Sequence, residues 1–211
     1  MVLILIAMSV VALSIVIVKW WQLRGVDAGN RRPVREALAL YRVGRRREAV
    51  ERIGRSRNPA ARILLDIERG RRRQVPAAML RDAAYHHASD VVETLRGHLK
   101  ALEVIAALAP LLGLFGTVVG MIEAFQQLEA AGSQVNPSVL SGGIWEALLT
   151  TAAGLSVAMP AIAALNWLER RVDRLAHEMD HVIVGALTED ITGSVGDARD
   201  EPLLEHGANA A

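Results

Sequence analysis

Two long apolar stretches decide the fold of this chain. Residues 104–122 read VIAALAPLLGLFGTVVGMI, and residues 139–168 read VLSGGIWEALLTTAAGLSVAMPAIAALNWL, with Glu146 as the single charged side chain in either. A membrane core is crossed by about 20 mainly apolar residues in a helix, so both stretches predict membrane-spanning helices. Thirty helical residues reach about 45 Å, so the second helix is expected to tilt within the bilayer or to extend beyond it.

The composition around these stretches also indicates a membrane protein. Of the 211 residues, 52% are hydrophobic and only 4% aromatic, and residues 101–169 contain no Lys or Arg. Twenty of the 24 basic residues lie at 19–100 and the other four at 170–211. A soluble globular enzyme would not concentrate its charge in this way. The chain also lacks cysteine, which excludes disulfides, thiol catalysis and cysteine-ligated metal centres.

A third apolar run, residues 2–18, is followed by a cation and two indoles, Lys19, Trp20 and Trp21, which suit a membrane interface. A cleaved signal peptide is the alternative, but the run has no basic residues before it and no small-residue cleavage site after it. Because basic residues favour the cytoplasmic side, we expect the N-terminus outside the cell and every Lys and Arg on the inner side.

The predicted fold is therefore all-α, a polytopic membrane protein whose three spans continue as long helices into the cytoplasm. The predicted segments are transmembrane helices at 1–18, 104–126 and 139–168, a cytoplasmic helical segment at 19–103, a short periplasmic loop at 127–138, a cytoplasmic helix extension at 169–192 and a disordered tail at 193–211.

Within the cytoplasmic segment, Pro33 is expected to begin an amphipathic helix, and Asn58-Pro59 to break the chain before another. From Pro76 to Leu128 the helical pattern is interrupted only by Pro110, which predicts one long helix. The arginine clusters could suggest nucleic-acid binding. We interpret them instead as topology signals that contact anionic lipid.

Glu146 is the candidate functional residue. A carboxylate inside a membrane helix costs about 2.5–3.5 kcal/mol on insertion scales, so Glu146 is expected to face protein or water and to serve as a proton or ion site. Thr150 follows at i+4 on the same helical face, whereas Thr151 belongs to a neighbouring face. The alternative is that Glu146 lies near the external interface, where water solvates it.

Small residues mark one face of the second span. Gly113, Gly116 and Gly120 permit close helix packing, and Thr117 lies among them with a hydroxyl that can bond across a helix contact. Pro110 and Pro160 lie inside the second and third spans, where they free backbone carbonyls. Both prolines are therefore further candidates for helix packing.

One pattern suggests a different chemistry. His177-Glu178-Met179-Asp180-His181 matches H-E-x-x-H, in which two histidines bind zinc and the glutamate acts as a general base. A third ligand is not evident, and the apolar positions around the motif suit an amphipathic extension of the third span. A membrane zinc protease remains an alternative, and no metal site is predicted.

Two motifs now point to a family. Residues 109–122 resemble A-P-x-x-G-L-x-G-T-V-x-G-M-I, and residues 143–155 resemble G-I-x-E-A-L-x-x-T-A-x-G-L, both typical of the ExbB/TolQ/MotA proton-channel family. Pro160 and Asn166 also match the pattern. The likeness is nearer to ExbB and TolQ than to MotA, which has four spans, although a MotA-like stator subunit remains an alternative.

The resemblance implies an inner-membrane homopentamer around an ExbD-like or TolR-like single-span protein with a membrane aspartate. This assembly would use proton flow to drive a TonB-like or TolA-like transducer, and the chain would be a transport component without enzymatic activity or cofactor. On this pattern Glu146 is the pore glutamate, Thr117 and Thr151 are polar pore positions, and Gly154 joins the packing residues. The helical face favours Thr150 and the family pattern favours Thr151. Both are candidates, and we follow the family pattern in preferring Thr151, because pore geometry between helices need not follow the face of one helix.

Overall fold

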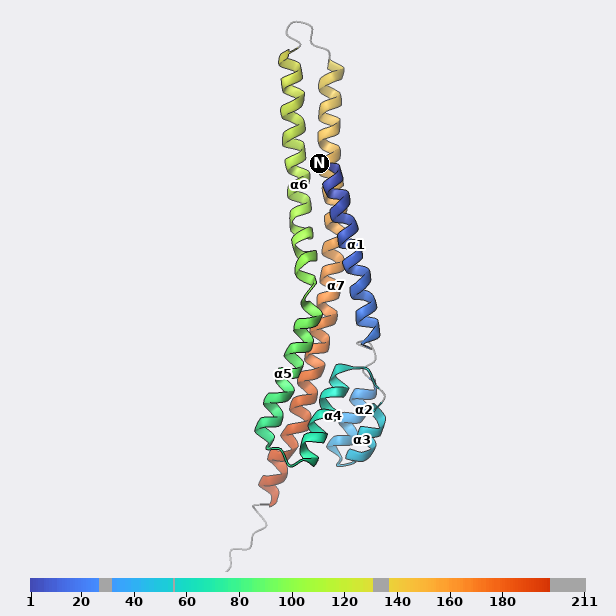
Figure 1. Ribbon diagram of the computed structural model, residues 1–211, viewed down its shortest axis with the longest axis vertical. Helices are drawn as coiled ribbons and strands as arrows, with labels where there is room; N and C mark the ends of the chain where they lie inside the picture. Colours follow the sequence, from blue (N-terminus) through green and yellow to red (C-terminus); the bar gives the residue numbers. More distant parts are fainter. Residues whose placement is uncertain (27–31, 55, 131–136, 198–211) are drawn as a thin grey trace, which may run out of the picture. The chain divides into compact units, whose positions relative to one another are not determined.

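The computed structural model describes residues 1–26, 32–54, 56–130 and 137–197, apart from the side chains at 137, 139 and 188–197. These residues form helices and turns without a strand, as predicted for an all-α protein (Figure 1). The helices are α1 (Val2–Gly25), α2 (Arg32–Arg42), α3 (Arg46–Ile53), α4 (Pro59–Arg72), α5 (Ala77–Arg96), α6 (Leu99–Ala130) and α7 (Pro137–Asp197).

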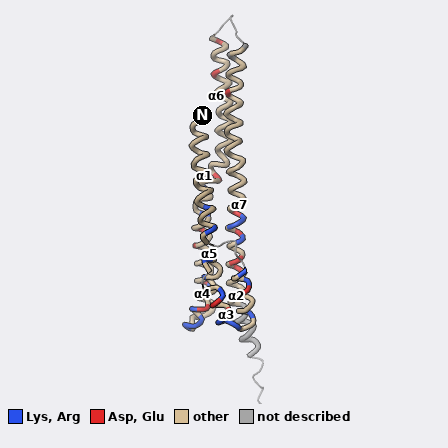
Figure 2. The backbone as a smooth tube through the Cα atoms, turned by 90° about the vertical axis from the view of Figure 1, so that its right-hand side faces the viewer, with Lys and Arg blue, Asp and Glu red and all other residues tan. Residues whose placement is uncertain are grey.

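The chain divides into two compact units. One, here called the apolar unit, consists of residues 1–24 and 93–173, and so holds α1, α6 and the first part of α7. The other, here called the charged unit, consists of residues 25–92 and the chain from residue 174 onward, and so holds α2, α3, α4, most of α5 and the last part of α7. The colours of Figure 2 follow this division, because blue, which marks Lys and Arg, is absent from most of the α6 tube.

Three helical stretches are long and apolar enough to cross a membrane: Val2–Gly25, Ala77–Ala130 and Leu140–Leu187. Their outer faces carry large exposed apolar side chains, such as Leu3 and Trp145, which a lipid environment accepts. This agrees with the three predicted spans.

Close backbone contact joins α6 to α7 in the apolar unit. A Cβ atom added at Gly154 would lie 2.7 Å from the Ala109 carbonyl oxygen, and one at Gly113 would lie 3.1 Å from the Thr150 carbonyl oxygen. Lipid is as apolar as these side chains, so van der Waals packing of small residues holds such helices together. α1 joins them through Leu5, which packs in a cluster with Ala109 and Ala158.

Several helix boundaries differ from the sequence-based expectation: α1 extends to Gly25, α6 to Ala130, and α7 begins at Pro137. The helix expected to run without a break from Pro76 to Leu128 is two helices, because a turn at Gly97 and His98 separates α5 from α6. Glycine is a poor helix former, and this turn marks the break that the apolar pattern hid. α7 continues to Asp197, so the first five residues of the tail expected at 193–211 are helical. Residues 198–211 lie outside the described residues.

The charged unit has its own core. Tyr41 and Ile53 are fully buried, as are Leu64 of α4 and Met179 of α7. α2 begins at Arg32, beside the predicted Pro33, and α4 begins at Pro59, where the Asn58 side chain accepts a hydrogen bond from the Ala60 N–H at 2.9 Å. Such a cap satisfies an N–H group that the first helical turn leaves without a backbone partner.

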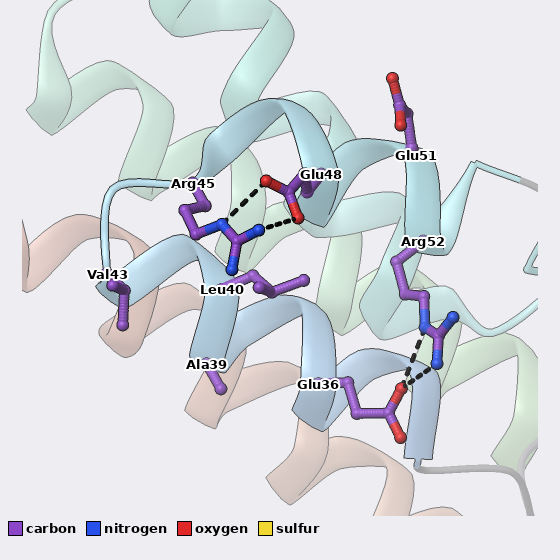
Figure 3. A pocket seen from close by; sticks show the side chains of 8 residues that line it. All are labelled: Glu36, Ala39, Leu40, Val43, Arg45, Glu48, Glu51 and Arg52. Carbon is purple, nitrogen blue, oxygen red and sulfur yellow. Dashed lines mark hydrogen bonds and ion pairs between the residues drawn. The ribbon is translucent and has the colours of Figure 1, made fainter.

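Ion pairs cover the outside of this unit. Arg52 of α3 contacts Glu36 of α2 at 2.7 Å, and Arg45 contacts Glu48 at 2.7 Å (Figure 3). All four side chains are exposed, so each pair contributes at most about 1 kcal/mol. Gly44, with a φ of +80°, makes the turn between α2 and α3 at a backbone conformation that side chains disfavour.

Candidate functional site

Glu146 lies on the α7 segment of the apolar unit and lines a groove of about 410 Å³, whose walls are α6 and α7 with Met1 and Val2 at the N-terminus. The side chain is exposed, and among the described residues it has no hydrogen-bond or ion-pair partner. The groove exists because small residues face one another across it: a Cβ at Gly143 would lie 2.6 Å from the Ala124 Cβ, and one at Gly120 would lie 3.0 Å from the Ala147 Cβ. A carboxylate therefore stands at an opening between two otherwise apolar helices.

A second carboxylate lines the same groove. Glu123 of α6 is exposed there, together with the amide side chain of Gln127. The sequence analysis assigned no role to Glu123. The available signal was its helical position, because Glu123 and Gln127 continue the face of Gly116 and Gly120 at steps of three and four residues.

The two candidate threonines of α7 occupy different places. Thr150 is buried in the groove that Glu146 lines, and its hydroxyl donates to the Ala147 carbonyl oxygen at 2.7 Å. Thr151 is half-buried and outside the groove lining, and its hydroxyl donates across the helix contact to the Gly113 carbonyl oxygen at 3.1 Å. The helical-face argument thus agrees with the position of Thr150 beside Glu146.

The remaining sequence candidates lie along α6 and its contact with α7. Thr117 is half-buried and donates to the Leu114 carbonyl oxygen of its own helix at 2.6 Å, away from the residues that line the groove. Gly113, Gly116 and Gly154 all face the opposite helix. Pro110 and Pro160 both lie within helices. The described chain therefore brings Thr150 to Glu146 and leaves Thr117 and Thr151 in separate helix-stabilising hydrogen bonds.

The H-E-x-x-H motif lies in the charged unit. His177, Glu178 and His181 of α7 line a second groove, opposite α2. Within the described ranges, no group of three or more His, Cys, Asp or Glu side chains is arranged to hold a metal ion. The zinc-protease alternative thus gains no structural support there.

Comparison of the sequence with known families assigns this chain to one of them. The family model described as MotA/TolQ/ExbB proton channel family matches residues 55–181, which include both carboxylates of the apolar groove. This chain belongs to that family. The match ends before the last described turns of α7 and omits α1, α2 and α3.

Curated relatives carry two names within the family. The chain is 35% identical over 159 residues to the biopolymer transport protein ExbB of Neisseria gonorrhoeae, covering 75% of this chain and 64% of that protein. It is 35% identical over 113 residues to biopolymer transport protein exbB1 of Vibrio cholerae, covering 52% of this chain and 50% of that protein. It is 38% identical over 92 residues to the Tol-Pal system protein TolQ of Haemophilus influenzae, covering 44% of this chain and 40% of that protein. The alignments therefore span between two fifths and two thirds of these relatives.

Family membership and the three apolar helices together make this a multi-pass membrane protein of the ExbB/TolQ type. The resemblance stated from the two sequence motifs is confirmed. In such a protein, polar side chains within the membrane spans are candidate functional residues. Placing them in lipid costs free energy, so they usually face protein or water and serve a function there. Glu146 and Glu123 are the carboxylates that the apolar groove exposes.

Proposed function

We propose that this chain is the proton-channel subunit of an ExbB/TolQ-like motor in the bacterial inner membrane, with its N-terminus outside. The motor would couple the proton motive force to energised transport across the cell envelope, or to maintenance of the envelope. One observation carries the proposal: Glu146 is exposed in a groove between two apolar helices and has no partner among the described residues. The names of the matched relatives favour this function over a MotA-like stator.

The chemistry needed is proton binding and release. A carboxylate at this depth costs about 2.5–3.5 kcal/mol on insertion scales unless protein or water surrounds it, so the groove is expected to be hydrated or covered in the assembly. Moving one proton through 100 mV yields about 2.3 kcal/mol, comparable to breaking a few hydrogen bonds. No covalent step is required, and the chain is proposed to act without enzymatic activity.

The proposed assembly is a homopentamer around an ExbD-like or TolR-like single-span protein, which drives a TonB-like or TolA-like transducer. The names of the relatives support this. Anionic lipid is a further proposed partner for the arginine-rich part, and nucleic acid is not proposed.

Thr117, Thr150 and Thr151 are proposed as the polar positions of the pathway. Thr150 is the member beside Glu146. Thr117 and Thr151 donate to carbonyl oxygens of α6 in the single chain. Hydroxyl groups accept and donate at once, so each can still accept a hydrogen bond from water or a carboxylic acid.

The test is proton flux in proteoliposomes that contain this chain and a co-purified single-span partner, followed with an internal pH-sensitive dye. We expect Glu146→Gln to reduce the flux at least about tenfold, because an amide cannot carry a proton. The control is Glu129→Gln, which removes an exposed carboxylate of α6, in the same apolar unit but outside the groove lining. Unchanged flux in Glu146→Gln with an intact assembly would reject the proposal.

A further inference from the structure

A second groove, of about 570 Å³, lies entirely within the charged unit. One wall is α2 and the other is the last part of α7. The side chains that line it are Val34, Arg35, Leu38 and Arg42 of α2 and Arg174, His177, Glu178, His181 and Val182 of α7. It is separate from the carboxylate groove of the apolar unit, and the proposed proton conduction makes no use of it.

Positive charge dominates this groove. Arg35 and Arg42 are seven residues apart, and so lie on one face of α2, while Arg174, His177 and His181 share one face of α7 at steps of three and four residues. Three guanidinium groups face a single carboxylate, that of Glu178, and both histidines can add charge when protonated. Like charges on opposing helices repel one another, and an anion between them would remove this repulsion.

The pocket of Figure 3 provides a comparison within the same unit. There two arginines meet three glutamates, and each arginine forms an ion pair. Arg35 and Arg42, in contrast, have no ion-pair partner among the described residues. The protein thus neutralises its arginines in one pocket and leaves two uncompensated guanidinium groups in the other.

The floor of the groove is tightly packed. Val34 and Val182 are each 1% exposed, and Leu38 is half-buried. A Cβ at Gly185 would lie 3.2 Å from both an Arg42 terminal nitrogen and a Leu38 methyl carbon, so the two helices approach closely there. The arginines therefore project from rigid helices, and ordering them around a ligand costs less than ordering a loop.

We propose that this groove binds a phosphate-bearing anion, either a soluble phosphate ester or a phospholipid headgroup. Planar guanidinium groups match phosphate with paired hydrogen bonds, and imidazole N–H groups are further donors. A phosphate group has acceptor oxygens in several directions, and so can meet donors from both walls at once. The two oxygens of a carboxylate lie in one plane, so a carboxylate can accept hydrogen bonds from one of the two helices more readily than from both.

The test uses the purified full-length protein in mild detergent, with inorganic phosphate as the probe. Thermal unfolding is followed at constant ionic strength while phosphate replaces chloride. We expect phosphate to raise the unfolding temperature of the wild type, and Arg35→Gln/Arg42→Gln to weaken the apparent affinity at least about tenfold. Arg35→Lys/Arg42→Lys keeps the positive charge but removes the planar guanidinium group with its paired N–H donors, so we expect this variant to lose part of the affinity for phosphate.

The matched control is Arg57→Gln/Arg62→Gln, which removes the same charge from exposed positions of the same unit outside the groove. This variant should keep the wild-type response. A second arm reconstitutes each variant in vesicles of phosphatidylglycerol and phosphatidylcholine, re-extracts it, and counts retained lipid by native mass spectrometry. If phosphate raises the unfolding temperature, the ligand is a soluble phosphate ester. If phosphate does not, but the protein retains phosphatidylglycerol selectively, the ligand is a phospholipid headgroup.

Three results would overturn the proposal. The first is an equal loss of binding in the control variant, which would reduce the effect to net charge. The second is an absence of any difference between the wild type and Arg35→Gln/Arg42→Gln in both arms. The third is a glutamate-rich peptide that stabilises the wild type at lower concentration than phosphate does, which would assign the groove to an acidic protein segment.

Discussion

The Lys19 ammonium group lies 2.8 Å from the Leu95 carbonyl oxygen, which joins the end of α1 to the end of α5. Lys19 is 1% exposed, and its Nζ also donates to the Thr94 carbonyl oxygen at 3.4 Å and the Gln22 side chain at 3.0 Å. The last carbonyls of a helix lack backbone partners and carry partial negative charge. Lys19 therefore caps α5 just before the turn that precedes α6, and a cation first interpreted as an interfacial anchor is part of the apolar unit's packing.

Replacing Lys19 tests this cap. Lys19→Met keeps the length of the side chain but removes the donor, so we expect a loss of about 1–3 kcal/mol in unfolding free energy because buried carbonyls lose their partner. Chemical unfolding in detergent measures it. Lys100→Met is the control, because Lys100 is exposed and its loss should change stability by less than about 0.5 kcal/mol. Equal effects of the two substitutions would contradict the capping role.

Helix packing is tested by two glycine substitutions in α7. Gly154→Ala would place its Cβ 2.7 Å from the Ala109 carbonyl oxygen and 2.9 Å from the Gly113 Cα, so α6 and α7 must separate. We expect a loss of about 1–3 kcal/mol, typical of overpacking, measured as a lower unfolding temperature. At Gly142 an added Cβ meets no atom of another described residue within 4 Å, apart from the adjoining backbone of its own helix. Gly142→Ala should therefore be neutral or slightly stabilising, because alanine favours the helix.

Glu123 offers a test of the apolar groove itself. If two carboxylates share the pathway, Glu123→Gln should lower proton flux severalfold, and less than Glu146→Gln does, because it leaves in place Glu146, the carboxylate proposed as the main proton site. The measurement is the proteoliposome flux described above, with Glu129→Gln as the common control. Wild-type flux in Glu123→Gln would restrict the pathway to Glu146.

Tyr41 makes the charged unit sensitive to alkali. Burial raises the pKa of Tyr41 to about 12 from an ordinary value near 10, and the nearby Glu68 carboxylate contributes to the rise. Because the folded-state pKa is the higher one, stability is fully present below pH 10 and is lost as the pH rises through 12. We expect about 2 kcal/mol to be lost between pH 10 and 12, at 1.36 kcal/mol for each pKa unit.

Tyr41→Phe should abolish the loss of unfolding free energy that ionisation of Tyr41 causes between pH 10 and 12. At neutral pH this variant should be about 1 kcal/mol less stable than the wild type, because the hydrogen bond from Tyr41 to Glu68 Oε2 is lost. Unfolding midpoints at pH 8 and 12 measure both effects. The other tyrosine supplies the control, because Tyr85 is 42% exposed and Tyr85→Phe should change the pH dependence less. If both variants show the same pH profile as the wild type, burial of the Tyr41 hydroxyl does not determine the alkaline loss.

Much of the architecture followed from local pattern. The apolar runs at 2–18, 104–122 and 139–168 require helices, because lipid offers no partners to a bare backbone. The segregation of Lys and Arg along the sequence already separates an apolar from a charged region. The proposed orientation and pentamer rest on charge bias and family resemblance, since a single chain carries no neighbouring copy.

The sequence predicted only part of the site. Glu146 is the lone charge within an apolar run, which marks it as a candidate. Glu123 follows the apolar run of its span, where a charged residue is common, so the sequence did not indicate a role for it. Helical periodicity alone places Thr150, four residues after Glu146, on the face of Glu146. Whether that face lines the groove depends on the rotation of α7 against α6, which the periodicity of one helix cannot determine.

The sequence by itself determined what each segment must be: which helices enter lipid, which carry charge, and which family they belong to. These properties depend on hydropathy, helix length and motif spacing, all of which are local along the chain. Only the tertiary structure decided which side chains meet. It brings Glu123 to Glu146, Lys19 to Leu95, and the arginines of α2 to the histidines of α7. Such encounters join residues distant in sequence, and they depend on the rotation and close approach of packed helices that small residues such as Gly154 permit.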